Sequence, residues 1–379
     1  MKTYIKVTLF ILAAFVSFTA CRESEEEIIP SGNYSPIRGG FPQGNTEYDS
    51  IINEIKNKYS VYLLYKDVTE EDMNRTWVSA GTGDIYVAGD SADRNKPSWE
   101  LPMVQLPIYV DFFNDYIFPN FTKKELAKKT FPIKIYMINN LRTEPRDYGE
   151  ENKVESGTDT NPNKIIKLGE FDNWAISFPD SIIDIIEVDG DSVCTLKNSE
   201  YTLKQMRCVF MINIIKNSIA KGDLVAPDEF WEDYSMNRNS TCLTSTTTKN
   251  HEGCDMVNVK DKEAANGLYT LGYVDVMEEK FGTEKSDSIW KNTDMFGGKD
   301  AHADNWNSPS NPTWNLFEAY IMNAMWLTTD EFNTKYNTAK HTKIKEKYDL
   351  VVEYMKEFGI DLVGIAEGKK EEEGKEELQ

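Results

Sequence analysis

The hydrophobic pattern of the chain is strongest between residues 202 and 233. Apolar side chains recur there at helical spacing, and the run at 208–215 is apolar almost all round. A helix with such a pattern is buried on most sides. Gly222 suits a position of positive φ just past the helix, and Pro227 suits the start of a second one. The stretch predicts a long central helix, a glycine stop and a short following helix.

Before this central helix the pattern switches between helical and strand periodicity. It predicts helices at 46–59, 102–119 and 123–130, and strands at 61–65, 84–88, 131–138, 165–168 and 173–178. The charged segment 142–163 has no periodicity and is interpreted as a loop, and 180–184 as a turn or a short helix.

After the central helix nearly every periodic stretch is helical. Helices are predicted within 264–281 and at 314–326, 331–336 and 342–358, with polar loops at 235–261 and 300–314. The order predicts an α+β fold, with a small mixed sheet in the N-terminal half and a mostly helical C-terminal half.

The N-terminus carries a separate signal. Lys2 and Lys6 precede a short apolar run at 7–18, which is closed by a small residue and Cys21. This resembles a bacterial lipoprotein signal peptide with its lipobox. The run is too short to span a bilayer comfortably. We expect residues 1–20 to be removed and the acyl chains on Cys21 to hold the protein to the outer membrane.

The residues behind Cys21 indicate a tether. An acidic cluster at 22–27 resembles the surface-export signal of Bacteroidota-type lipoproteins, although such charges could also simply keep a tether solvated. Glycine and proline recur through 21–48, so this segment is interpreted as flexible. The folded domain is expected at 49–366, and the Glu- and Lys-rich tail at 367–379 is expected to be disordered. We expect the domain to face the cell surface.

Composition narrows the partners. The net charge of -21 argues against nucleic acid and against an anionic lipid surface. Once Cys21 is acylated, four cysteines remain, which permit two disulfides in three connectivities. A bridge between Cys242 and Cys254 would close a polar loop, whereas Cys208 could be a small core residue.

Candidate chemistry is sparse, because the chain has three histidines. His251 opens a segment of the form HExxD, but its glycine places it in a loop, where helical i, i+4 geometry is absent. One alternative is a metal site formed by His251, Cys242, Cys254 and Asp255. The other is a disulfide between the two cysteines, which would exclude them as metal ligands. His302 and His341 stand in polar surroundings and are expected to be solvated.

Several stretches together resemble the substrate-import-associated zinc metallohydrolase lipoproteins, which are gluzincin-type metallopeptidases. The stretches are the lipobox, YSVYLLY, FPIKIYMI, the apolar helix followed by PDEF, SPSNPTWNLFEAYIMNAMW and KEKYDLVVEYMKEFGIDL. The resemblance implies a zincin-like fold. Because genes of this family often lie beside TonB-dependent nutrient import systems, it also implies import components as partners.

The chain departs from this family at the metal ligands. The family's HExxH places two imidazoles one turn apart with a general base between them. The corresponding turn here is Ile214-Ile215-Lys216-Asn217-Ser218. The resemblance implies that Glu318 matches the third zinc ligand, although a lone glutamate on a helix is more often at the surface or in a cap.

These observations favour a surface lipoprotein whose metallopeptidase-like domain is degenerate. We expect no catalytic residue, no zinc and a dry centre filled by Ile214 and Ile215. Such a protein would be a binding or accessory subunit of an import system, with a peptide or glycan as its ligand. The alternatives are an active hydrolase using a site around Glu318 or His251, and a structural lipoprotein without a ligand.

Overall fold

The computed structural model describes residues 37, 40–69, 72–73, 84–88, 100–139, 141–145, 166–167, 173–178, 183–188, 191–196, 200–232, 234, 243–244, 257–258, 261–277 and 316–368. The chain divides between Phe41 and Pro42 into two units, and the second holds the elements below. Cys21, the signal peptide and residues 369–379 lie outside the described residues.

A four-stranded mixed sheet occupies the N-terminal half. Its order is β1 (Tyr62–Leu64), β3 (Lys134–Met137), β6 (Asn173–Ile176) and β5 (Ile166–Lys167). The first three strands are parallel, and β5 is antiparallel to β6. All four were predicted within one to three residues. Parallel neighbours need crossover connections, and here helices supply the one between β1 and β3.

Three smaller sheets accompany the main one. Strands β2 (Asp84–Ala88) and β4 (Leu141–Pro145) pair antiparallel, as do β7 (Ile183–Val188) and β8 (Asp191–Leu196). The two-residue strands β9 (Leu243–Thr244) and β10 (Val257–Asn258) pair in parallel. Strand β4 corrects the loop interpretation of 142–163, and β7 corrects that of 180–184.

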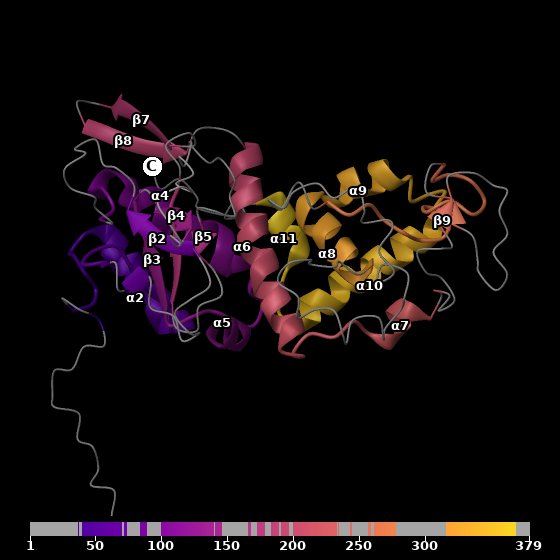
Figure 1. Cartoon of the computed structure of the whole chain (residues 1–379), viewed down its shortest axis with the longest axis horizontal. Coiled ribbons are helices and arrows are strands. Elements are labelled where there is room, and N and C mark those ends of the chain that lie inside the picture. The colour runs from indigo at the N-terminus through magenta and orange to yellow at the C-terminus, as the bar shows by residue number, and fades with distance from the viewer. Residues whose placement is uncertain are drawn as a thin grey trace, which may run out of the picture. The chain divides into compact units, whose positions relative to one another are not determined.

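The helices of the N-terminal half lie close to this sheet (Figure 1). Helix α2 (Glu47–Tyr59) begins at Thr46, which forms a capping box with Asp49. The single helix predicted at 102–119 is instead four short helical segments of different types. They are η1 (Met103–Gln105, 3₁₀), α4 (Leu106–Asp111), η2 (Phe112–Ile117, π-helical) and η3 (Phe118–Asn120, 3₁₀). Helix α5 (Lys124–Thr130) follows.

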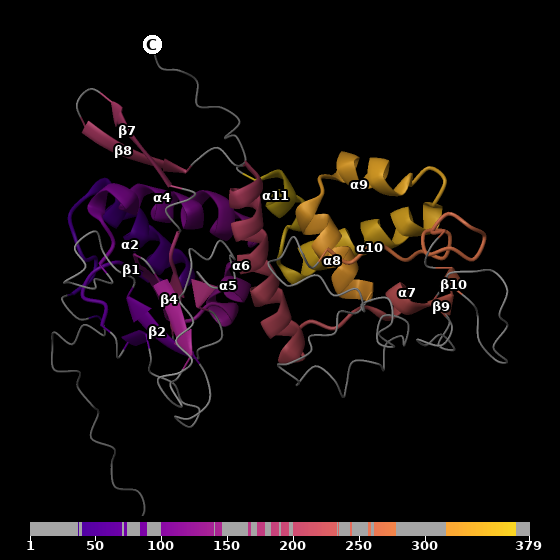
Figure 2. The same cartoon turned by 45° about the horizontal axis from the view of Figure 1, so that its top comes forward.

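Helix α6 (Glu200–Ala220) stands between the sheet-bearing half and the helical half in both views (Figures 1 and 2). Its Phe210 ring centroid lies 5.5 Å from those of Phe113 and Trp174 and 6.0 Å from that of Phe131. Gly222 follows with φ of 74°, as predicted. Helix α6 is therefore the central buried helix that the pattern indicated.

The C-terminal half is helical. Its helices are α7 (Asp228–Trp231), α8 (Leu316–Trp326), α9 (Thr329–Tyr336), α10 (Thr342–Phe358) and α11 (Leu362–Glu367). Thr328 caps α9 through a capping box with Glu331, and Gly359 is the C-cap of α10. The helix predicted within 264–281 is wrong for its described part, since 261–277 forms turns and irregular backbone rather than a helix. Within the described part of the chain, no helix combines the length and apolarity that crossing a membrane requires.

Candidate functional site

The turn of α6 at 214–218, which the resemblance aligns with HExxH, is closed by apolar packing at three of its positions. Ile214 and Ile215 are 0% exposed and Ser218 is 1% exposed. The Ser218 hydroxyl donates to the Ile214 carbonyl at 3.1 Å, so it is satisfied within its own helix. Ile214, Ile215 and Ser218 are thus closed to water, whereas Lys216 and Asn217 of the same turn are partly exposed.

Glu318 is 0% exposed, on a helix whose eleven residues are all buried. Glu318 is therefore not at the surface, and it lies in the first turn of α8. A carboxylate taken fully out of water is costly unless its surroundings compensate it. This position is therefore more constrained than a solvated helix position would be.

Helices α6 and α8 are neighbours. The Cys208 thiol, in the first half of α6, lies 3.3 Å from the carbonyl of Met325, near the end of α8. At the other end, the ring centroid of Phe317 lies 5.3 Å from that of Phe230, which follows α6. Steps of seven residues, about 10 Å each, lead from the Cys208 contact to Ile215 on α6 and to Glu318 on α8.

Cys208 is a buried thiol rather than a reactive one. Burial raises its pKa to about 12, although the charges of Arg207 and Lys204 act in the opposite direction. Only the thiolate is a good nucleophile or metal ligand. Cys208 is therefore a core residue, one of the readings that the sequence left open.

No metal centre forms among the residues that the structure describes. No three His, Cys, Asp or Glu side chains come together there in a way that could hold an ion. The alternative set of His251, Cys242, Cys254 and Asp255, and the bridge between its two cysteines, lie outside the described residues, as does His302.

His341 contradicts its prediction. Its side chain is 3% exposed instead of solvated, and its Nε2 lies 2.8 Å from Glu263 Oε2. Lys340 contacts the same carboxylate oxygen. Together these two neighbours lower the pKa of the Glu263 carboxyl.

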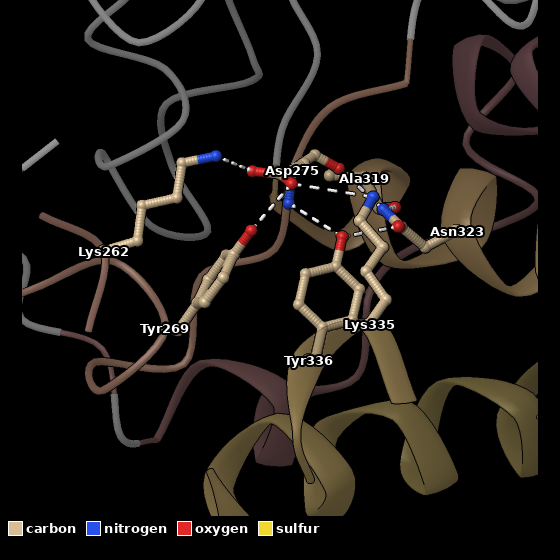
Figure 3. A network of polar contacts seen from close by, with 7 residues as sticks. All are labelled: Lys262, Tyr269, Asp275, Ala319, Asn323, Lys335 and Tyr336. Atoms are coloured by element: carbon tan, nitrogen blue, oxygen red, sulfur yellow. Dashed lines mark hydrogen bonds and ion pairs between the residues drawn. The ribbon is translucent and has the colours of Figure 1, made fainter. Parts of the chain in front are cut away.

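A second carboxylate, Asp275, organises a polar network between the turn segment 261–277 and the C-terminal helices (Figure 3). Its Oδ1 lies 2.5 Å from Lys262 Nζ, and its Oδ2 accepts a 2.8 Å hydrogen bond from the Tyr269 hydroxyl. Lys335 Nζ on α9 lies 3.5 Å from Oδ2. The carboxylate is thus surrounded by donors from two segments.

The backbone of Asp275 extends this network into α8 and α9. Its N–H donates to the Tyr336 oxygen at 3.1 Å, and the Tyr336 hydroxyl donates to Asn323 Oδ1 at 2.7 Å. Asn323 Nδ2 donates to the carbonyls of Asp275 at 2.6 Å and Ala319 at 2.8 Å. The network ties 261–277 to the buried helix α8 at Asn323, five residues after Glu318.

The sequence did not single out this network. Asn323 and Tyr336 sit in helical patterns, where they look like ordinary core positions. The glycines of this segment were a signal that the sequence offered. Gly272 has φ of 87°, and a Cβ added at Gly267 would lie 2.3 Å from the Lys262 carbonyl oxygen. Such glycines mark tight turns where a helix had been predicted.

Asp275→Asn should lower stability by about 1–2 kcal/mol at pH 7, because charge-assisted contacts are lost. Burial alone would raise the Asp275 pKa, but Lys262, Lys335 and Tyr269 lower it on balance. Its stabilisation is therefore complete above the unfolded pKa of about 3.9 and is lost as pH falls through the folded value.

Urea unfolding of both chains from pH 7 down to pH 3 measures this effect. The gap between wild type and Asp275→Asn should narrow on acidification. The control is Asp349→Asn, since Asp349 forms an exposed i, i+4 pair with Lys345 and such pairs contribute only about 0.3–0.5 kcal/mol. A gap that stays constant with pH would contradict the ionic role of Asp275.

Comparison with known proteins gives little. No family model matches the chain, and no curated protein sequence matches it. Among solved structures, a Bacteroides caccae protein described as a "putative zinc-binding metallo-peptidase" is similar with a TM-score of 0.38 and 10% identity. The similarity covers 86% of this chain and 92% of that one.

Proposed function

We propose that the chain is an outer-membrane lipoprotein, anchored through Cys21 and facing the cell surface. Its metallopeptidase-like domain is non-catalytic and acts as a binding or accessory subunit of a nutrient import system. The lipobox-like leader and the acidic cluster behind Cys21 support the location. The resemblance to import-associated lipoproteins supports the role.

The closed turn of α6 is the observation that carries the non-catalytic part. A catalytic zinc site needs three protein ligands and an open position for water. Here Ile214 and Ile215 are fully buried, and the Ser218 hydroxyl is engaged by its own helix. Glu318 would be left as a single carboxylate, which cannot hold zinc with the family's ligand set.

One preparation tests both parts. The full-length protein is extracted from host outer membranes, loaded with zinc and dialysed, and then its intact mass and metal content are measured. We expect a mature chain that begins at an acylated Cys21 and contains no stoichiometric zinc. An unacylated chain would contradict the proposed lipid anchor at Cys21.

One zinc per chain would instead favour the alternative of an active hydrolase. That alternative further requires peptidase activity that a chelator abolishes. The activity should also be lost in Glu318→Ala or in His251→Ala. Zinc without such activity would still overturn the degenerate site.

A further inference from the structure

The hairpin of β7 and β8 exposes an unusual amount of apolar surface. Seven large apolar side chains are exposed in the described part of the chain, and four of them lie on this hairpin. They are Ile185 at 56%, Ile186 at 42%, Val188 at 45% and Val193 at 39% exposure. Scattered exposed apolar residues are normal, but a concentration on one element indicates an interaction site.

The register shows how these residues are arranged. Ile186 pairs with Val193 and Val188 pairs with Asp191, so Ile186, Val188 and Val193 share one face of the pleated sheet. Ile183 and Cys194 belong to the opposite face and are buried. Ile185 shares that second face and is 56% exposed, so only part of it anchors the hairpin, while the first face presents Ile186, Val188 and Val193 to solvent.

The hairpin also has an outer edge. Strand β8 contacts η1 and α4, whereas the strongest contacts of β7 are with β8. In both views β7 lies on the side of β8 away from α4 (Figures 1 and 2). Among described residues the two strands pair only with each other. A two-stranded sheet with an open edge is a ready template for a third strand.

Charge decides what would occupy this edge. Residues 183–196 contain four acidic side chains and no Lys or Arg: Asp184, Glu187, Asp189 and Asp191. A second copy would bring like charges opposite one another, which is unfavourable across strands. An anionic membrane would be repelled as well. A partner segment that carries Lys or Arg between apolar residues complements both the apolar face and the charge.

We propose that an extended basic segment of a partner protein adds to β7 as a third strand. Its main chain pairs with the β7 edge, and its apolar side chains cover Ile186, Val188 and Val193. This mode of recognition uses backbone hydrogen bonds for affinity and alternate side chains for specificity. The inference rests on the proposed function only for the existence of a partner protein.

The test uses the full chain and a defined probe. The probe is a fluorescent octapeptide of alternating Lys and Val, compared with a Glu–Val peptide and with a Lys–Val peptide interrupted by proline. We expect binding of the first peptide only, weakening as salt is added. Amide exchange should slow in β7 when the peptide is bound.

Two matched variants locate the binding surface. The variant Ile186→Lys with Val193→Lys should bind the basic peptide at least about tenfold more weakly, because it removes apolar contact and adds repulsion. The control, Ile133→Lys with Val225→Lys, changes two apolar residues that are each 55% exposed elsewhere. It adds the same charge and should retain binding.

Each other outcome overturns the proposal. Equal binding of the Glu–Val or proline peptide would exclude strand addition by a basic segment, as would equal loss in the control variant. Self-association that Ile186→Lys abolishes in sedimentation would identify a second copy as the occupant. Binding to neutral phosphatidylcholine vesicles that the same variant abolishes would identify a membrane. Zinc content is measured separately, so a failure of the peptide-binding test would not contradict the proposal that the metal site is degenerate.

Discussion

The triple variant Ile214→His, Ile215→Glu and Ser218→His should produce a chain whose thermal stability depends on zinc. Positions 214 and 218 are one helical turn apart on α6, which is the spacing that places two imidazoles on one face. Seven residues along each helix from the Cys208–Met325 contact are Ile215 on α6 and Glu318 on α8, so we expect Glu318 to lie near this turn. The graft therefore supplies the two histidines and the glutamate of HExxH, with Glu318 as the third ligand that the resemblance implies.

Without zinc the same variant should be severely destabilised. It buries three polar groups at positions that are 0–1% exposed, and each unsatisfied group costs about 1–3 kcal/mol. A total of about 3–9 kcal/mol is a large part of the stability of an ordinary domain. Zinc at about 1,000 times its dissociation constant would restore about 4 kcal/mol.

Thermal unfolding with and without zinc measures this, read by circular dichroism. The control adds Glu318→Ala to the triple variant, which removes the third ligand and should reduce the zinc-induced rise in Tm. If the Tm of the triple variant does not change with zinc, this turn of α6 does not correspond to the HExxH turn of the metallopeptidase family.

Arg207→Met should cost about 3 kcal/mol of folding stability. Arg207 is 4% exposed, and its guanidinium donates to the carbonyls of Ile365 at 2.5 Å and Ala366 at 2.9 Å. It also lies over the ring of Tyr116, 5.9 Å from the centroid. Methionine keeps much of the volume but leaves two buried carbonyls near the C-terminus of α11 without their charged donor, at about 1.5–3 kcal/mol each before relaxation.

Chemical denaturation gives this number directly. The control is Lys221→Met, since Lys221 is an exposed cation just past the end of α6 and its loss should change stability by less than about 0.5 kcal/mol. Arg207→Lys should fall between the two, because a single ammonium lacks the planar fork. Equal stability of Arg207→Met and wild type would mean that α11 is held by its apolar face alone.

The sequence predicted elements well where local spacing decides the outcome. Helix α10 (Thr342–Phe358) was predicted at both ends, because its apolar positions repeat regularly and Gly359 stops it. The prediction from sequence failed where residues far apart in the chain decide the local structure. Strand β4 carries charge and forms because it pairs with β2, about 57 residues earlier. At 102–119 the apolar spacing is helical on average, but Pro107 and Pro119 accompany changes of helical type.

The site was less predictable than the fold, because the periodicity of apolar residues does not predict which polar residues are buried. Glu318 and Asn323 lie on a helix that is apolar almost everywhere else, and only packing shows that both are 0% exposed. His341 looked solvated beside its polar neighbours, but its side chain is 3% exposed and contacts Glu263, far away in sequence. The hairpin signal was present in the Asp189-Gly190 dipeptide, which is typical of two-residue turns.

The position of Cys208 limits the oxidative chemistry open to the chain. It is a free thiol enclosed between α6 and the Met325 carbonyl, so it takes no part in a disulfide. The four cysteines behind Cys21 therefore cannot form two bridges, and at most one pair remains among the other three. In an oxidising compartment this thiol escapes modification only while α6 and α8 stay together. Its rate of alkylation consequently reports how often the centre of the protein opens.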